Sequence, residues 1–345
     1  MLTPVDGANA PRLITQGEIE VVVGHYREAM ARYEEAASVL EHRLRRELRA
    51  AAIKTLVLSR AKHPDEVRRD LEEQRASEDP AEPELTYNKL SADLNREITD
   101  LSRATVIVYH PIDEQAAFEM ILRRFPLADV PHPIEHQQDR HRGSRALVEI
   151  DESFERPSLE GSIVEVKVAS ISSHIFNELG ADIGFKADTD EQPEDVSEGI
   201  EDLLYLSRLT DRAVQRLLEA RRTRLFDASE PLDNPVDLRH ALEQMVGHTL
   251  TGDFQRLYRL LDTVVHPFTA GALAALGPAE KMLEQGAEIA SGLGLHETGG
   301  DDDVLCYTLA LMPAFGPEFQ ELAKNWRGPT NDIKNAILGW KKPSP

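Results

Sequence analysis

Apolar residues in the N-terminal part of the sequence recur at steps of three to five positions, with charged residues between them. This spacing places the apolar side chains on one side of a helix. It predicts a helical region over residues 17–73, interrupted near His63-Pro64 because proline disfavours helical backbone in the residue before it. A second helical pattern covers residues 85–101 and follows a polar, proline-containing loop at residues 75–84.

Three short segments instead carry dense β-branched and apolar residues, which is typical of buried strands. They cover residues 104–109, 145–150 and 162–168. Helical patterns at residues 113–124 and 171–185 lie between and after them. This alternation predicts a mixed sheet with helices packed around it, which is an α+β architecture.

The second half of the sequence contains only helical patterns, at residues 200–226, 236–263, 267–291 and 301–325. An acidic, proline-containing segment with few large apolar residues precedes them. We therefore expect an α+β domain over residues 17–186, a linker over residues 187–199, and an all-α domain over residues 200–345.

The charge of the sequence limits the kinds of partner that it can bind. The 345 residues include 39 Lys and Arg against 61 Asp and Glu, which gives a net charge of −22. Such a charge disfavours non-specific binding to duplex DNA or to an anionic membrane, because every phosphate contact needs a local cation. A small basic pocket for a nucleotide remains compatible with it.

Cysteine content and apolar runs indicate the compartment. The single cysteine, Cys306, cannot form an intramolecular disulfide, and no run approaches the roughly 18 apolar residues of a membrane span. The first 20 residues contain acidic residues and two prolines and lack the apolar core of a signal peptide. We expect a cytoplasmic protein that does not bind a membrane.

Two acidic residues stand at informative positions of the predicted sheet. Asp100 precedes the first strand, and Glu165 interrupts the apolar third strand, where it shares a face with Lys167. Carboxylates on neighbouring strands can hold Mg²⁺ against a polyphosphate. A solvated sheet face is the alternative explanation for Glu165 and Lys167.

Five short segments, in a fixed order, resemble the RelA/SpoT-type alarmone synthetase domain over roughly residues 30–186. They are Ser59–Glu66, Asp100-Leu101, Gly143–Leu147, Val164–Val168, and His174–Leu179 with Gly184–Lys186. The resemblance implies a nucleotidyltransferase-like fold. It also implies transfer of the β,γ-pyrophosphate of ATP, with Mg²⁺, to the 3′-hydroxyl of a guanosine nucleotide.

The resemblance also implies roles for individual residues. Asp100 and Glu165 match the metal-binding and catalytic carboxylates. The residues expected at the ATP phosphates are Arg60, Lys62, Arg103 and Lys167. Those expected at the acceptor are Ser144, Arg145, His174, Asn177, Glu178 and Lys186.

Several positions depart from the family pattern. Ser144 replaces the tyrosine that stacks on the acceptor guanine, Glu66 replaces a serine of the ATP segment, and Arg103 stands two residues earlier than the family's arginine. Base stacking on an aromatic side chain contributes about 1–3 kcal/mol. The acceptor is therefore open between a guanosine nucleotide, an adenosine nucleotide and the 3′ end of a transfer RNA.

Other functions are compatible with the same residues. One is a catalytically degenerate nucleotide sensor whose helical half is an interaction module, and another is a toxin of a toxin–antitoxin or phage-defence system. Arg208, Arg212 and Arg216 recur every four residues in the first helix of the all-α domain. They form either a solvated face or a cationic surface for RNA or a protein partner.

Overall fold

The computed structural model divides into two compact units. The first comprises Met1–Arg45 and Thr55–Arg208, and the second comprises Arg46–Lys54 and Leu209–Pro345. The structure describes residues 13–77, 86–130, 134–135, 143–183, 194–225, 229–293, 295, 302–324 and 337–338. Among the helices of these described residues, none combines the length and the apolar character that crossing a bilayer requires.

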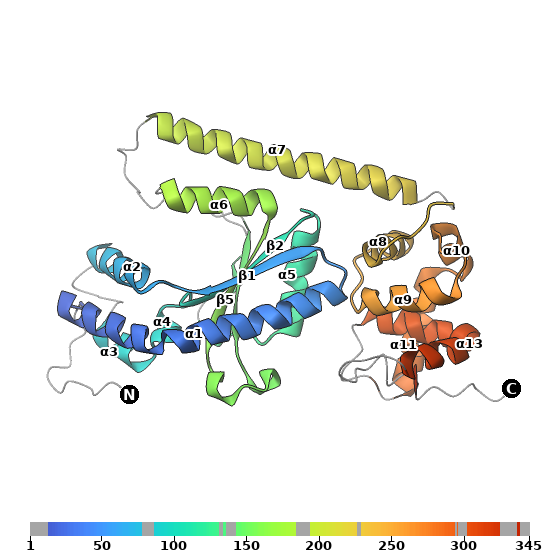
Figure 1. Ribbon diagram of the computed structural model, residues 1–345, viewed down its shortest axis with the longest axis horizontal. Helices are drawn as coiled ribbons and strands as arrows, with labels where there is room; N and C mark the ends of the chain where they lie inside the picture. Colours follow the sequence, from blue (N-terminus) through green and yellow to red (C-terminus); the bar gives the residue numbers. More distant parts are fainter. Residues whose placement is uncertain are drawn as a thin grey trace. The chain divides into compact units, whose positions relative to one another are not determined.

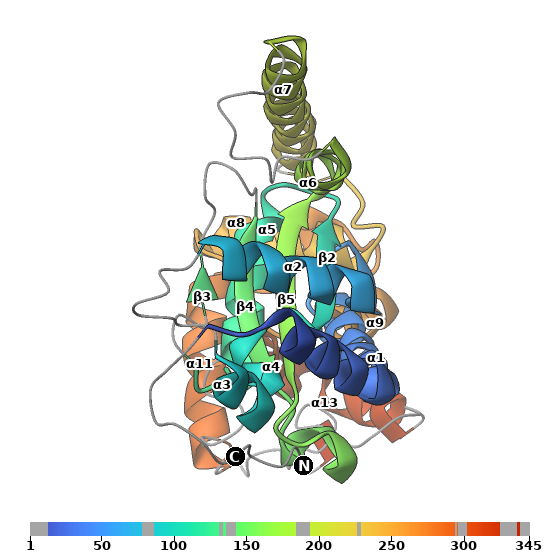
Figure 2. The same cartoon turned by 90° about the vertical axis from the view of Figure 1, so that its left-hand side faces the viewer.

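The first unit is built on a five-stranded mixed sheet with the strand order β1-β2-β5-β4-β3 (Figures 1 and 2). The strands are β1 Thr55–Ala61, β2 Ser102–Val108, β3 Ile134–Glu135, β4 Ser144–Glu149 and β5 Ile163–Ser170. β2 and β5 are parallel, and the other neighbouring pairs are antiparallel. This arrangement confirms the mixed sheet expected from the sequence.

Helices flank this sheet. They are α1 Gln16–Ala50, α2 Pro64–Ser77, α3 Tyr87–Ala92, α4 Leu94–Glu97, α5 Asp113–Arg124 and α6 Ile171–Ile183, with two 3-10 turns at Glu152–Phe154 and Pro157–Leu159. α1 packs on the sheet face that carries Ser59 and Ser102, because Ser59 Oγ donates to Glu41 and Ser102 Oγ donates to the Tyr33 carbonyl at 2.9 Å. α5 occupies the residues predicted for it, 113–124.

The sequence-based prediction was wrong for β1, which lies inside the region expected to be helical. α1 ends at Ala50, and Ala52 then adopts a left-handed backbone with φ of 53°. In β1, Val57 and Ala61 are buried while Leu56 and Leu58 are exposed. Val57 and Ala61 are four residues apart, so the same positions fit one face of a helix or one face of a strand.

β1 is an edge strand of the sheet, and α1 contacts its backbone directly. Arg45 Nη2 donates a hydrogen bond to the Val57 carbonyl at 2.7 Å. β1 has only one neighbouring strand. Its pairing with β2 and the hydrogen bond from Arg45 stabilise it in this position.

Two further predictions differ in detail. The expected helix over residues 85–101 is two short helices, because Asp93 ends α3 and its side chain accepts from the Arg96 backbone amide at the start of α4. Of the predicted linker, residues 187–193 lie outside the described residues. Residues 194–199 are helical and begin α7 Glu194–Leu225.

The second unit is helical in its described part, which confirms the expected all-α region. Besides the C-terminal part of α7, it contains α8 Pro235–Val246, α9 Phe254–Val264, α10 Ala270–Ala275, α11 Ala279–Gly292 and α13 Asp303–Lys324. The single helix expected over residues 236–263 is divided after α8, where Gly247 adopts a left-handed cap with φ of 77°. α10 ends without such a cap at Leu276, and Gly277 follows with φ of 141°.

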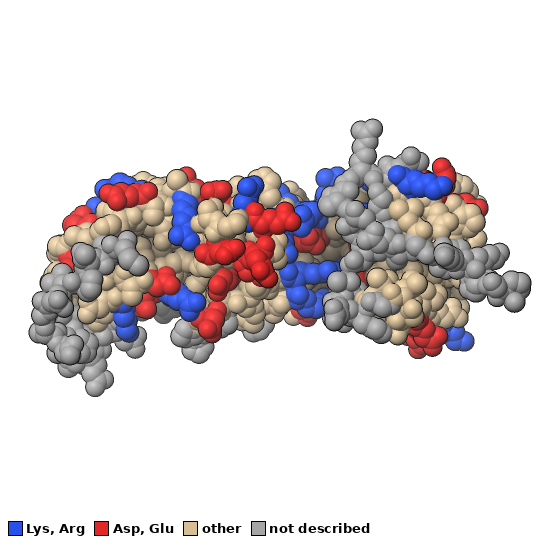
Figure 3. Space-filling view, turned by 90° about the horizontal axis from the view of Figure 1, so that it is seen from below, with Lys and Arg blue, Asp and Glu red and all other residues tan. Residues whose placement is uncertain are grey.

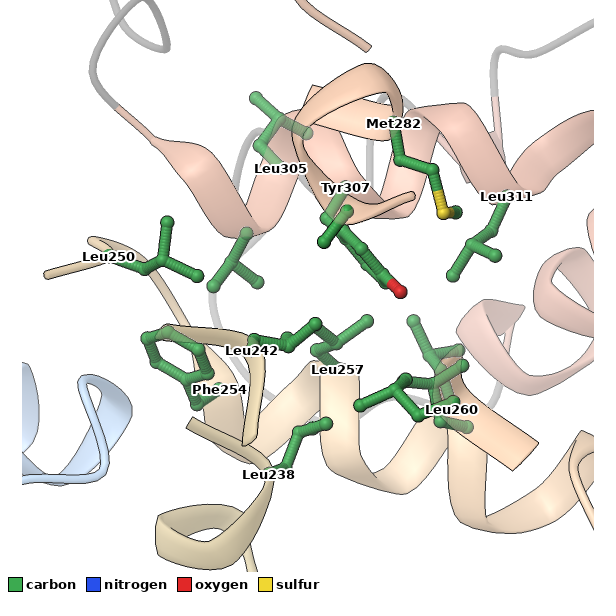
Figure 4. Close-up of a cluster of buried hydrophobic side chains, with 14 of the residues drawn as sticks. Leu238, Leu242, Leu250, Phe254, Leu257, Leu260, Met282, Leu305, Tyr307 and Leu311 are labelled. Atoms are coloured by element: carbon green, nitrogen blue, oxygen red, sulfur yellow. The ribbon is translucent and has the colours of Figure 1, made fainter. Parts of the chain in front are cut away.

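Leucine and aromatic side chains fill the core of this unit (Figure 4). The Tyr307 ring lies among these side chains, with its hydroxyl directed toward Leu260 and Leu311. Burial raises the pKa of this hydroxyl, which has no hydrogen-bond partner among the described residues. Tyr307 therefore contributes to stability chiefly through its ring.

α11 and α13 approach each other closely at Gly286. A Cβ atom added to this glycine would lie 1.8 Å from the Cys306 carbonyl oxygen. Because the obstacle is backbone, relief requires the two helices to move apart.

We expect Gly286→Ala to lower the free energy of unfolding by at least about 2 kcal/mol, since overpacking that moves backbone costs typically 1–3 kcal/mol or more. Urea denaturation followed by circular dichroism measures this loss. Gly292→Ala is the matched control, because no atom lies within 4 Å of its added Cβ and alanine favours helix. Equal stability of the two variants would contradict the close approach of α11 and α13.

Candidate active site

One face of the sheet in the first unit carries a row of charged residues. The strand register pairs Arg60 with Arg103 and Arg103 with Glu165. It also pairs Arg145 with Lys167, which lies two residues after Glu165 on β5. Paired residues and residues two apart share a sheet face, so all five side chains emerge on the face opposite α1.

Glu165 lies at the centre of this row and is only 2% exposed. Arg103 Nε donates to its Oε2, and Arg145 Nη1 lies 3.4 Å from its Oε1. Lys167 Nζ lies 3.9 Å from Oε2. A buried carboxylate is very costly unless it is paired and hydrogen-bonded. These three cations explain how a glutamate is accommodated in an otherwise apolar strand.

Lys62 and Asp100 form a second, partly buried pair where β1 ends and β2 begins. Lys62 Nζ donates to both oxygens of Asp100, at 2.8 and 2.7 Å, and also contacts the Asp70 carboxylate of α2. The hydroxyl of Tyr26, in α1, donates to the Lys62 carbonyl at 2.6 Å. This bond and the contact with Asp70 fix the position of Lys62.

Arg103 joins the two carboxylates. Its Nη2 donates to Asp100 Oδ2 at 3.0 Å while its Nε binds Glu165. Burial alone would raise the pKa of Asp100, but the charges of Lys62 and Arg103 outweigh burial and lower it. Burial opposes the charge of Arg103 as well, yet Glu165 and Asp100 raise its pKa. Both groups are therefore charged at neutral pH.

Lys167 has a different balance of forces. Burial is the largest influence and lowers its pKa, against the opposing charge of Glu165, while nearby Arg103 also lowers it. The surroundings of Lys167 therefore disfavour the charged form of its ammonium group.

Arg60 lies at the end of the row, on the edge strand β1. Its side chain is 53% exposed and forms an ion pair with Glu66, with 2.9 Å between Nη1 and Oε2. Burial would raise the pKa of Glu66, but the hydrogen bond and charge of Arg60 lower it. Glu66 thus neutralises Arg60 in this structure.

The residues predicted for the acceptor are distributed differently. Ser144 pairs with Val168, which places it on the sheet face opposite Arg145 and Glu165. His174, Asn177 and Glu178 lie on α6, with 3.7 Å between His174 Nδ1 and Glu178 Oε1. Lys186 lies outside the described residues.

The structure therefore brings together the predicted carboxylates and cations around Glu165 and Asp100. Sequence reasoning missed Asp70 and Tyr26, which hold Lys62 in place. Their positions depend on how α2 and α1 cross the end of β1, and neither residue belongs to a motif that would have revealed this contact.

The donors available to a metal are the carboxylates of Asp100 and Glu165. No group of three or more His, Cys, Asp or Glu side chains suited to a metal occurs within the described parts of the chain. Mg²⁺ is commonly held by one or two carboxylates together with substrate phosphates. The oxygen donors present thus fit Mg²⁺ that binds with a polyphosphate, and the surrounding cations suit the phosphate charges.

On the face seen in Figure 3, acidic side chains of the described residues gather near the middle of the view, with basic side chains on both sides of them.

We expect Lys62→Met to lower the free energy of unfolding by about 2–4 kcal/mol, because it leaves two carboxylates without their shared ammonium group. Arg60→Met removes a cation of the charged row from an exposed ion pair and should lower the free energy of unfolding by no more than about 1 kcal/mol. Urea denaturation of both variants measures the difference. A loss of similar size in both would mean that the contacts of Lys62 with Asp70 and Asp100 contribute little.

Comparison with solved structures gives matches of low sequence identity. No family model and no curated protein matches the chain. Small alarmone synthetase 1 from Bacillus subtilis is 15% identical with a TM-score of 0.43, and the match covers 58% of this chain and 99% of that one. A GTP pyrophosphokinase family protein from Streptococcus pneumoniae is 14% identical with a TM-score of 0.44, with coverage of 57% and 94%.

Proposed function

We propose that the chain is a divergent pyrophosphotransferase, which moves the β,γ-pyrophosphate of ATP to a hydroxyl group of a nucleotide or RNA. The observation that supports this most strongly is the carboxylate pair of Asp100 and Glu165 on one sheet face. Four cations, Lys62, Arg103, Arg145 and Lys167, contact these carboxylates. The combination suits phosphoryl-group transfer, in which positioning and charge neutralisation dominate.

The proposed reaction assigns tasks to these residues. The acceptor oxygen forms a bond to the β-phosphorus of ATP while the bond between that phosphorus and the α,β-bridging oxygen breaks, which releases AMP. Glu165 accepts the proton of the attacking hydroxyl. Arg145 and Lys167 bind the oxygens of the transferred group. Mg²⁺, held by Asp100 and Glu165, supplies further neutralisation of phosphate charge when it is bound.

The proposal places ATP on the charged face beside β1 and β2. There Lys62 and Arg103 are available to the triphosphate, and Arg60 joins them if its exposed pair with Glu66 opens. An exposed ion pair contributes at most about 1 kcal/mol, so a polyphosphate can compete for this guanidinium.

The acceptor is proposed as a class rather than a single molecule. Ser144 has no aromatic ring on which a base could stack and faces away from Glu165. Candidates are a guanosine nucleotide such as GDP or GTP, an adenosine nucleotide, and the 3′ end of a transfer RNA. The α6 residues His174, Asn177 and Glu178 are proposed to contribute to acceptor binding, together with Lys186.

The helical part of the chain is proposed as a separate domain that binds RNA or a protein partner. Arg208, Arg212 and Arg216 are exposed along α7, which suits an acidic partner. A cytoplasmic location, where ATP is available, completes the proposal.

A nucleotide sensor without turnover is the second candidate. It is favoured by the ion pairing of the site, since each carboxylate proposed for catalysis already binds at least two cations. Calorimetry with ATP would then detect binding while no product forms.

We expect the purified chain, incubated with Mg²⁺, γ-labelled ATP and the acceptor panel, to transfer label to one acceptor and release AMP. Thin-layer chromatography and mass spectrometry identify both products. Glu165→Gln and Asp100→Asn should lower the rate at least about 100-fold, as expected for loss of a proton acceptor or a metal ligand.

The control for this assay is Glu160→Gln, which makes the same chemical change at an exposed residue just before β5. It should retain the activity of the unmodified protein. Absence of transfer to every acceptor would refute the enzyme, and binding of ATP in that case would support the sensor.

A further inference from the structure

Arg103 bridges Asp100 and Glu165, the two carboxylates proposed to hold a divalent cation. We propose that Arg103 is a built-in counter-cation that competes with metal for both carboxylates. Metal then binds well only together with a polyphosphate, which attracts the guanidinium away. This inference deepens the proposed function because it rests on the same site.

The geometry gives the first argument. One guanidinium donates from Nη2 to Asp100 and from Nε to Glu165, so it bridges the two carboxylates. The side chains of Arg103 and Asp100 are each 23% exposed, and that of Glu165 is 2% exposed. A metal ion that binds these carboxylates would therefore have to compete with this guanidinium for their oxygens.

The charge balance gives the second argument. The network around the two carboxylates contains the cations Lys62, Arg103, Arg145 and Lys167 and the carboxylates Asp70, Asp100 and Glu165. Each of the two carboxylates Asp100 and Glu165 is thus already paired with at least two cations. A bare divalent cation that approaches either carboxylate meets this positive charge, and little water screens the repulsion.

A polyphosphate reverses this balance. Nucleoside triphosphate carries several negative charges, and arginine binds phosphate oxygens with two parallel hydrogen bonds. Transfer of Arg103 from the carboxylates to the phosphates would leave both carboxylates available as metal ligands. Binding of metal and of polyphosphate would then favour each other, with equal effect in both directions.

The other cations near the carboxylates have different roles. Lys62 keeps a partner in Asp70 if Asp100 turns to a metal, and Lys167 contacts Glu165 at 3.9 Å without a hydrogen bond. Lys167 is thus a matched comparison for Arg103. It carries the same charge beside Glu165, but its ion pair does not connect Glu165 to Asp100.

The test is titration of the full chain with Mn²⁺ alone, without nucleotide, followed by electron paramagnetic resonance of free Mn²⁺. We expect weak binding to the unmodified protein and at least about 10-fold tighter binding to Arg103→Gln. Lys167→Gln removes the same charge and should tighten binding less than about 3-fold. Arg103→Lys, which retains the charge but not the two-armed bridge, should lie between the unmodified protein and Arg103→Gln.

Two further measurements secure the interpretation. The double variant Arg103→Gln with Glu165→Gln should lose the gain, which locates the added metal at this site. Circular dichroism and thermal unfolding verify that each variant is folded, and Arg103→Lys provides the test if Arg103→Gln does not fold. In that case the proposal is overturned if Arg103→Lys binds Mn²⁺ no more tightly than the unmodified protein does.

The remaining outcomes are also decisive. Equal Mn²⁺ affinity of the unmodified protein and Arg103→Gln would overturn the proposal, as would an equal gain in Arg103→Gln and Lys167→Gln. Because the titration uses no ATP and no acceptor, it is independent of the transfer assay. A chain that transfers nothing but gains Mn²⁺ affinity in Arg103→Gln would refute the proposed enzyme and support the counter-cation.

Discussion

The buried carboxylate of Glu165 is the constraint on which the first unit depends. A charge in the middle of an otherwise apolar strand is tolerated only where cations from neighbouring strands reach it. β2 contributes Arg103 and β4 contributes Arg145, each at a position fixed by strand pairing. A slip of one residue in either strand would move its arginine to the opposite face and leave Glu165 without that partner. The register of the sheet and the chemistry of the site are therefore set by one interaction.

The connection from β1 to α2 places a cation, Lys62, beside the second carboxylate, Asp100. Lys62 follows the last residue of β1, where its amide still donates to the Leu101 carbonyl at 2.9 Å. Its side chain is thereby held between a carboxylate of the β2 entry and one of α2. The Lys62 ammonium group binds Asp70 of α2 and Asp100, which precedes β2. The position of α2 is therefore coupled to the position of the Asp100 carboxylate.

Much of this fold follows from local sequence patterns. Dense β-branched and apolar residues identify β2, β4 and β5, which are buried strands, and the helical pattern of residues 113–124 gives the bounds of α5. β1 was missed because Val57 and Ala61 fit either period. Asp100, Glu165 and their cations were found from motifs, but Asp70 was not, since its contact with Lys62 exists only after α2 folds back across the strand. The opposite orientation of Ser144 was equally inaccessible, because it depends on the register of β4 with β5.

The contact between Arg45 and the Val57 carbonyl also has a meaning for the behaviour of the chain in solution. An edge strand with unoccupied backbone groups and exposed leucines is a template for pairing with a second molecule. In β1 the guanidinium of Arg45 already binds one of those carbonyls, while Leu56 and Leu58 remain exposed on the charged face. Arg45 of the first helix thus occupies one hydrogen-bonding group of the exposed edge, which makes β1 a less complete template for a foreign strand.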